Sequence, residues 1–212
     1  MRWARSGDTV AVHVGVDASR EVYYLAADLS SDAGLRCGDA ADRAALTAMQ
    51  RRSEVLLAGR RGLALLARSM HSRRALALKL RRAGFATAPV TQALQRLDDL
   101  GYLDDIGFAR LWVRGRVERG GDGRARVLAG LLSRGVSRQD AQAAVAAEYP
   151  PEREAEICRE LAARLAQQLP AGDRGATRVA RQLARRGFPN HRVLQVLQGL
   201  QLADGMADEY DL

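Results

Sequence analysis

The chain has 212 residues and a mass of 23.1 kDa, enough for one large domain or several small ones. Hydrophobic residues make up 47% and charged residues 27%, which excludes a disordered or collagen-like chain. No apolar stretch reaches the roughly 18 residues of a transmembrane helix, and the short run from Val10 to Val16 makes a poor signal peptide. The two distant cysteines, Cys37 and Cys158, argue against a disulfide framework and a zinc site, so we expect a cytoplasmic protein with inert thiols.

The first predicted elements are two strands. Residues 9–14 and 21–25 alternate between apolar and polar side chains and are rich in β-branched and aromatic residues, which predicts a β-hairpin. Two strands alone are marginally stable, so the hairpin must pack on another element. Residues 30–42 are rich in Gly, Asp and Ser and are expected to form a connecting loop, which completes an N-terminal region over residues 1–43.

From Ala44 onward the pattern is helical and it repeats. Gly84, Gly135 and Gly187 are spaced by 51 and 52 residues, with apolar residues eight and four before each glycine and one, six and ten after it. Residues spaced by four share one face of a helix, and a glycine ends a helix easily because it accepts the left-handed conformation. Only the second repeat breaks the pattern thirteen residues after its glycine, where Glu148 stands.

A further helix is predicted before each glycine-centred pair, at about residues 44–67, 105–119 and 152–168. The expected fold is therefore mainly α, with three tandem three-helix repeats in an elongated curved array and a small N-terminal β-hairpin. The repeats are expected at residues 44–103, 104–149 and 150–212.

The basic charge lies in the middle of the chain. The net charge is +8, and residues 51–138 hold 19 basic and 7 acidic residues, a net +12. All basic residues except Lys79 are arginines, which suit forked contacts with phosphates and carboxylates, although such a bias can equally reflect a genome's base composition. The central charge predicts a polyanionic partner, either nucleic acid, a nucleoprotein surface or an acidic protein face; a solvated charged surface is the alternative.

No catalytic motif is present, so we expect a protein that is not an enzyme and needs no cofactor or metal. The segment Gly120–Gly123, followed by Arg124 and Arg126, is the best candidate for a phosphate-binding loop. A flexible loop between helices is the favoured interpretation, because the spacing of a known phosphate motif is missing.

Other polar and aromatic residues have structural interpretations. The pairs Asp98–Asp99 and Asp104–Asp105 fit helix ends and caps better than a metal site. The three histidines, His13, His71 and His191, have no Cys or His partner at ligand spacing. Three aromatic residues are expected to pack between helices, with base stacking as the alternative: Tyr102, Phe108 and Trp112.

Several segments together resemble the RecX family. Residues 66–85 resemble its first repeat, 97–109 the junction into its second repeat, 123–136 the second repeat's core and 181–188 the third repeat. The hairpin followed by residues 35–39 is similar to longer members of the family. The chain differs in having Ala75 where a Glu is usual, Trp112 where a Tyr is usual, and arginines in place of lysines.

The resemblance implies a non-enzymatic cytoplasmic regulator of RecA, with a role in DNA repair, homologous recombination and the SOS response. Such proteins bind the RecA–single-stranded DNA filament along its groove, suppress its ATPase and strand exchange, and limit its growth. No membrane is implied, and we expect a monomer.

A general basic helical-repeat protein that binds single- or double-stranded nucleic acid is the alternative, based on the central charge alone. On either interpretation, basic side chains carry the contacts. The residues expected to face RecA or DNA are Arg73, Arg74, Lys79, Arg81, Arg82, Arg124, Arg126, Arg134, Arg138, Arg185 and Arg186.

Overall fold

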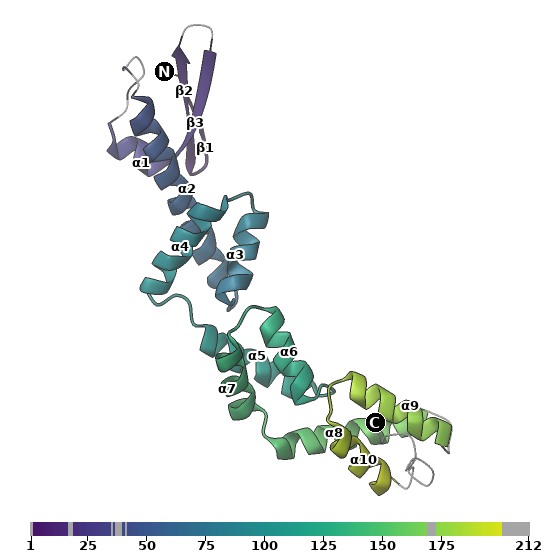
Figure 1. The fold of residues 1–212 in the computed structure, drawn as a ribbon. Helices are drawn as coiled ribbons and strands as arrows, with labels where there is room; N and C mark the ends of the chain where they lie inside the picture. Colours follow the sequence, from purple (N-terminus) through teal and green to yellow (C-terminus); the bar gives the residue numbers. More distant parts are fainter. Residues whose placement is uncertain are drawn as a thin grey trace. The chain divides into compact units, whose positions relative to one another are not determined.

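The computed structural model describes residues 2–16, 19–34, 36, 40, 42–168 and 173–200, and gives residues 2–6, 15, 16, 19, 20 and 173 by their backbone alone. The chain forms two compact units, Met1–Asp104 and Asp105–Leu212. The described part is mainly helical with a small N-terminal sheet, as the sequence predicts (Figure 1).

The sheet has three antiparallel strands in the order β1 (Arg2–Ser6), β2 (Thr9–Val16) and β3 (Ser19–Ala26). Strands β2 and β3 form the predicted hairpin, but the prediction missed β1. The segment is short and carries two arginines, which gives it no clear strand pattern, and it pairs along its whole length with β2 at the edge of the sheet.

The hairpin finds its packing partner in the first long helix, α2 (Arg43–Leu66). The buried side chains of Val10, Val12, Val14 and Leu25 form one cluster with Leu46 of α2. This cluster supplies the apolar contact that a small sheet needs for stability.

A short helix, α1 (Ala27–Asp32), was not predicted, and its second half lies in the segment expected to form a loop. Its six residues are too few to show helical periodicity in the sequence. The hydroxyls of Ser30 and Ser31 both donate to the carbonyl of Ala27, whose own N–H donates to Asp8. Residue Cys37 and most of the expected loop after Gly34 lie outside the described residues.

Nine helices follow within the described residues, in three groups of three, which confirms the tandem three-helix repeats. None of the helices in the described ranges is long and apolar enough to cross a membrane. The first repeat holds α2, α3 (Arg73–Arg82) and α4 (Thr87–Asp99). The second holds α5 (Asp105–Arg119), α6 (Arg124–Ser133) and α7 (Arg138–Glu148), and the third holds α8 (Pro151–Gln168), α9 (Asp173–Arg185) and α10 (Asn190–Gly199).

The three repeated glycines occupy equivalent turns, as predicted. Gly84, Gly135 and Gly187 have φ values of 96°, 80° and 83°, in the left-handed region. After each glycine, the next N–H donates over 3.3 Å to the carbonyl of the leucine four residues before the glycine. This hydrogen bond is that of a Schellman motif, which ends one helix and starts the chain toward the next.

The apolar residues of the register form the core. Residues eight and four before each glycine are at most 1% exposed, and in the second unit the helices α5–α10 share one continuous apolar cluster. At the position thirteen residues after the glycine, Leu97 of the first repeat is buried. The third repeat departs from the pattern here, as the second does, because Leu200 is 36% exposed. In the second repeat, Glu148 stands at this position and accepts two hydrogen bonds from Arg114 of α5.

Alanine substitutions at glycines should separate backbone strain from close packing. Gly84→Ala meets no atom within 4 Å, so only its left-handed conformation opposes it, at roughly 1–2 kcal/mol. At Gly187 an added Cβ would also lie 2.7 Å from the backbone nitrogen of Arg126, so the loss should be clearly larger. Urea unfolding followed by far-UV circular dichroism measures both.

Gly59→Ala is the control for these variants. Gly59 lies inside α2 with no atom near its absent Cβ, so alanine should stabilise the protein by about 0.5–1 kcal/mol. Equal losses for Gly84→Ala and Gly187→Ala would contradict the close approach at Gly187.

Candidate partner-binding surface

Helix α3 carries five of the residues predicted to face a partner. Arg74, Lys79, Arg81 and Arg82 are exposed, and α3 begins with the side chain of Ser72 accepting a hydrogen bond from the N–H of Ala75. That single bond is the half of a capping box that the sequence retains. Basic residues in the last turn of a helix also interact favourably with its negative end.

Lys79 and Arg73 differ from their neighbours on α3. Lys79 Nζ lies 3.1 Å from His71 Nε2, and burial together with the charge of Lys79 lowers the pKa of His71. Arg73 forms an ion pair with Asp98 of α4 and donates to Gln95 Oε1 at 2.9 Å. Arg73 therefore fastens α3 to α4, which reduces its availability to a partner.

The Gly120–Gly123 segment is the predicted loop between helices, and hydrogen bonds and close packing hold its backbone. The N–H of Gly123 donates to the carbonyl of Arg186 at 2.8 Å, and Arg186 Nη1 donates to the carbonyl of Gly121 at 3.0 Å. A Cβ on Gly123 would overlap the backbone of Gly187. The glycines of the loop thus allow the second repeat to approach the α9–α10 turn of the third.

The N-terminus of α6 already holds an anion from within the protein. The N–H of Arg124 donates at 2.7 Å to Oε1 of Glu154, a residue of α8 that is only 5% exposed. A carboxylate is stabilised at a helix N-terminus by the free N–H groups and the helix dipole. Glu154 therefore occupies the place where a bound phosphate would lie, and the phosphate-loop alternative receives no support here.

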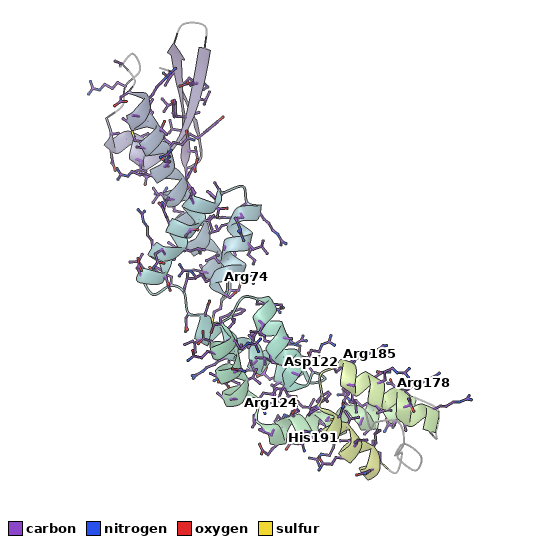
Figure 2. The ribbon with its side chains drawn as sticks, in the orientation of Figure 1. Arg74, Asp122, Arg124, Arg178, Arg185 and His191 are labelled. Atoms are coloured by element: carbon purple, nitrogen blue, oxygen red, sulfur yellow. The ribbon has the colours of Figure 1, made fainter. Side chains whose placement is uncertain are left out.

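Asp122 joins several side chains beside this loop. Its carboxylate pairs with Arg116 and with Arg126 Nε, the latter at 3.2 Å, and its carbonyl accepts from the Tyr149 hydroxyl at 2.8 Å. Arg126 Nη1 also donates to the carbonyl of Arg185 at 2.9 Å. Figure 2 labels Asp122 and Arg185 near each other, where α6 begins and α9 ends. Like Arg186, Arg126 connects the second and third repeats.

The ring of Trp112 contacts two arginines, Arg116 and Arg134, and packs against Gly130. The guanidinium carbon of Arg134 is 4.7 Å from the ring centroid and that of Arg116 is 5.5 Å away, distances of cation–π contacts. A Cβ on Gly130 would lie 2.5 Å from the ring, so this helical glycine makes room for it. A glycine inside a predicted helix was the sequence signal for this close packing.

The expectation that aromatic residues pack between helices is confirmed for two of the three. Phe108 and Trp112 pack against the core of the second unit. It is wrong for Tyr102, which is 54% exposed because it follows the turn at Gly101 that ends α4.

The remaining predicted residues are exposed. Arg138 begins α7 and Arg185 ends α9, and both lie on the surface. Arg178 of α9 is exposed, was not in the predicted set, and projects from the helix in Figure 2. It shares the register position of Arg126, nine residues before the glycine, but Arg126 is engaged internally.

Within the ranges that the structure describes, no group of three or more His, Cys, Asp or Glu side chains is arranged to hold a metal ion.

Cys158 is buried as a free thiol, and its burial raises the pKa to about 11, which favours the unreactive protonated form. Burial also raises the pKa of Tyr149 above its usual value, so its hydroxyl stays a donor. Cys158 and Tyr149 both belong to the apolar core of the second unit.

Comparison with known proteins identifies the first two of the three repeats. Residues 59–97 match the family model for the first three-helix domain of RecX, and residues 104–145 match that for the second. The chain is 39% identical over 156 residues to a regulatory protein RecX from Halorhodospira halophila, covering 70% of this chain and 87% of that protein. The chain belongs to the RecX family.

Other relatives agree with this assignment. A regulatory protein RecX from Treponema pallidum is 36% identical over 142 residues, which are 67% of this chain and 76% of that protein. Two crystal structures share the fold of this RecX-family chain at 20% identity. The structure of a regulatory protein RecX has a TM-score of 0.70, and the match covers 92% of this chain and 95% of that chain. The structure of RecX from Lactobacillus salivarius has a TM-score of 0.62, and the match covers 70% of this chain and 97% of that chain.

The hydrogen bond from Tyr149 should stabilise the loop beside α6. Tyr149→Phe removes the donor to the carbonyl of Asp122, which should cost about 1 kcal/mol of unfolding free energy. The amides of Gly123 and Arg124 should then exchange hydrogen faster, because the loop opens more often. Amide hydrogen exchange with mass spectrometry measures the change.

Tyr102→Phe is the matched control, since Tyr102 is exposed and loses the same hydroxyl. It should leave both stability and loop exchange unchanged. Equal exchange in Tyr149→Phe and wild type would show that the loop does not depend on this bond.

Proposed function

We propose that this protein regulates RecA by binding the RecA–single-stranded DNA filament, and that binding lowers RecA's ATP hydrolysis, strand exchange and filament growth. The observation that carries the proposal is the exposed basic surface of α3 in a chain that holds both RecX three-helix domains. Relatives named regulatory proteins support the same role. The site of action would be the cytoplasm, during DNA repair, recombination and the SOS response.

The exposed arginines of α3 fit a filament of protein and DNA. Arg74, Arg81 and Arg82 form no ion pair with any residue that the structure describes, so their charges face solvent. A cluster of this kind attracts an acidic surface over a distance of about one Debye length, roughly 8 Å at physiological salt. Arginine then forms forked hydrogen bonds with carboxylates or phosphates at contact.

The structure divides the predicted basic residues into two groups. Arg73, Arg126 and Arg186 make internal contacts that join helices. The rest are proposed as partner-facing residues, and Arg178 is added to them: Arg74, Lys79, Arg81, Arg82, Arg124, Arg134, Arg138, Arg178 and Arg185. Of these, Arg134 also stacks on Trp112 within its own repeat.

The proposed regulation requires no chemistry from this protein. A bound protein changes RecA's activity when it binds one state of the filament more tightly than another, because only differential affinity shifts an equilibrium. The second candidate function, general binding of nucleic acid, is favoured only by the net +12 of residues 51–138.

Titration into an ATPase assay tests the proposal. Purified RecA on circular single-stranded DNA should hydrolyse ATP more slowly as the protein is added, with the full effect near stoichiometric amounts. An unchanged rate at stoichiometric excess would reject regulation of RecA.

Binding to bare DNA, measured in parallel, tests the second candidate. A general nucleic-acid binder should bind tightly, with log affinity falling by about 0.9 per contacted phosphate for each log unit of salt on duplex DNA. Weak binding without this salt dependence would reject it.

Charge reversal on α3 tests the proposed surface. The double variant Arg81→Glu, Arg82→Glu should need about tenfold more protein for half-maximal ATPase inhibition, since roughly 0.7 kcal/mol is expected per exposed charge contact. Far-UV circular dichroism verifies the fold, because acidic residues disfavour a helix C-terminus.

The matched control is Arg51→Glu, Arg52→Glu on α2. These two arginines are also adjacent, exposed and without an ion pair among the described residues, but they are outside the proposed set. This variant should retain nearly wild-type inhibition. The same loss in both variants would assign the effect to overall charge, and no loss in either would place the contact elsewhere.

A further inference from the structure

A groove of about 700 Å³ opens within the second unit, and we refer to it as the α6–α10 groove. The helices α6, α7, α8 and α10 and the α9–α10 turn contribute its lining, and this volume is within the range of ligand sites. Its apolar lining includes Leu128 and Val145, and its basic lining includes Arg124, His191 and Arg192. Figure 2 shows Arg124 at the start of α6 and His191 at the start of α10.

Two arginines of the groove carry unused hydrogen-bond donors. The Nε atoms of Arg124 and Arg192 are shielded from solvent, and neither has a hydrogen-bond partner within the described part of the chain. Arg192 also donates from Nη1 to Gln195 Oε1 at 3.2 Å. A buried donor without an acceptor destabilises the protein, so an anion that supplied acceptors would recover that free energy.

The acidic residue in the groove does not satisfy these donors. Glu154 directs Oε1 to the backbone N–H of Arg124, as described above, and its residue is only 5% exposed. Two permanently charged guanidinium groups therefore line the groove beside one carboxylate, whose Oε1 already accepts from a backbone N–H. The balance of charge in the groove favours an added anion.

The apolar part of the groove favours a peptide over nucleic acid. Proteins that bind single strands stack the bases on accessible aromatic rings. Among the lining residues that the structure describes, Phe188 is the one Phe, Tyr or Trp, and it is only 3% exposed and committed to the core. Leu128 is half-buried in the lining and suits an aliphatic side chain.

We propose that the α6–α10 groove binds an acidic segment of the protein partner. A carboxylate of that segment lies between Arg124 and Arg192, and a neighbouring aliphatic side chain packs on Leu128. This inference rests on the proposed function and adds a contact in the second unit to the one proposed for α3 in the first.

Site-specific cross-linking to the RecA–single-stranded DNA filament tests the inference. The photoreactive residue p-benzoylphenylalanine replaces exposed His191 in the full chain, and cross-linked RecA peptides are identified by mass spectrometry. The expected product joins position 191 to a RecA peptide that contains Asp or Glu beside an aliphatic residue. The same probe at Gln167, an exposed residue of α8 that does not line the groove, should give little product.

Neutral variants then test the role of charge. Arg124→Gln with Arg192→Gln should lower the yield from position 191 at least fivefold, while Arg159→Gln with Arg164→Gln, both exposed on α8, should not. Circular dichroism confirms that each pair is folded, and single variants at Arg124 and Arg192 replace the pair if it is not.

The outcomes distinguish this inference from the proposed function. Three results would overturn the groove assignment alone, provided that the protein cosediments with the filament. These are cross-links to DNA, cross-links to a RecA peptide without acidic residues, and a yield no higher than that from Gln167. An undiminished yield in the Arg124–Arg192 variants would also overturn it. Failure of the wild-type protein to cosediment with the filament would overturn both.

Discussion

Each three-helix repeat depends on one backbone conformation, the left-handed glycine between its second and third helices. The hydrogen bond that follows the glycine returns the chain toward the end of the helix it has just left, so the apolar faces of both helices meet. In the third repeat this turn has a second role, because Gly187 also lies against the backbone of Arg126. Glycine is needed there both for its conformation and for its small size.

The arginines of this protein serve two purposes that their number alone does not reveal. Some make internal contacts that stabilise the fold. Arg114 donates two hydrogen bonds to Glu148, which lower the pKa of that carboxyl, and Arg186 donates to the carbonyl of Gly121 in the loop before α6. Others, such as Arg81 and Arg82, remain on the surface. A highly basic composition therefore overstates the charge available to a partner, and the available charge is the quantity that matters for the proposed regulation of RecA.

The Gly120–Gly123 loop illustrates how one feature of a sequence can belong to several physical settings. Glycines before a helix suit a phosphate, a mobile connection or a close approach of two backbones. The decisive neighbours are Glu154 and Arg186, which are about 30 and 60 residues away in the chain and arrive only when the third repeat packs on the second. The same packing creates the α6–α10 groove, in which the Nε atoms of Arg124 and Arg192 are left without acceptors.

The sequence by itself determined the helical repeats, the positions of their glycine turns and nearly all of the first helix of each repeat. These features depend on periodicity and on backbone conformation, which are local properties of neighbouring residues. Only the tertiary structure decided that β1 completes the sheet, that Tyr102 is exposed, and which arginines are bound internally. Those outcomes depend on which distant segment lies beside a residue, and a long polar side chain can reach several neighbours without leaving any periodic signal in the sequence.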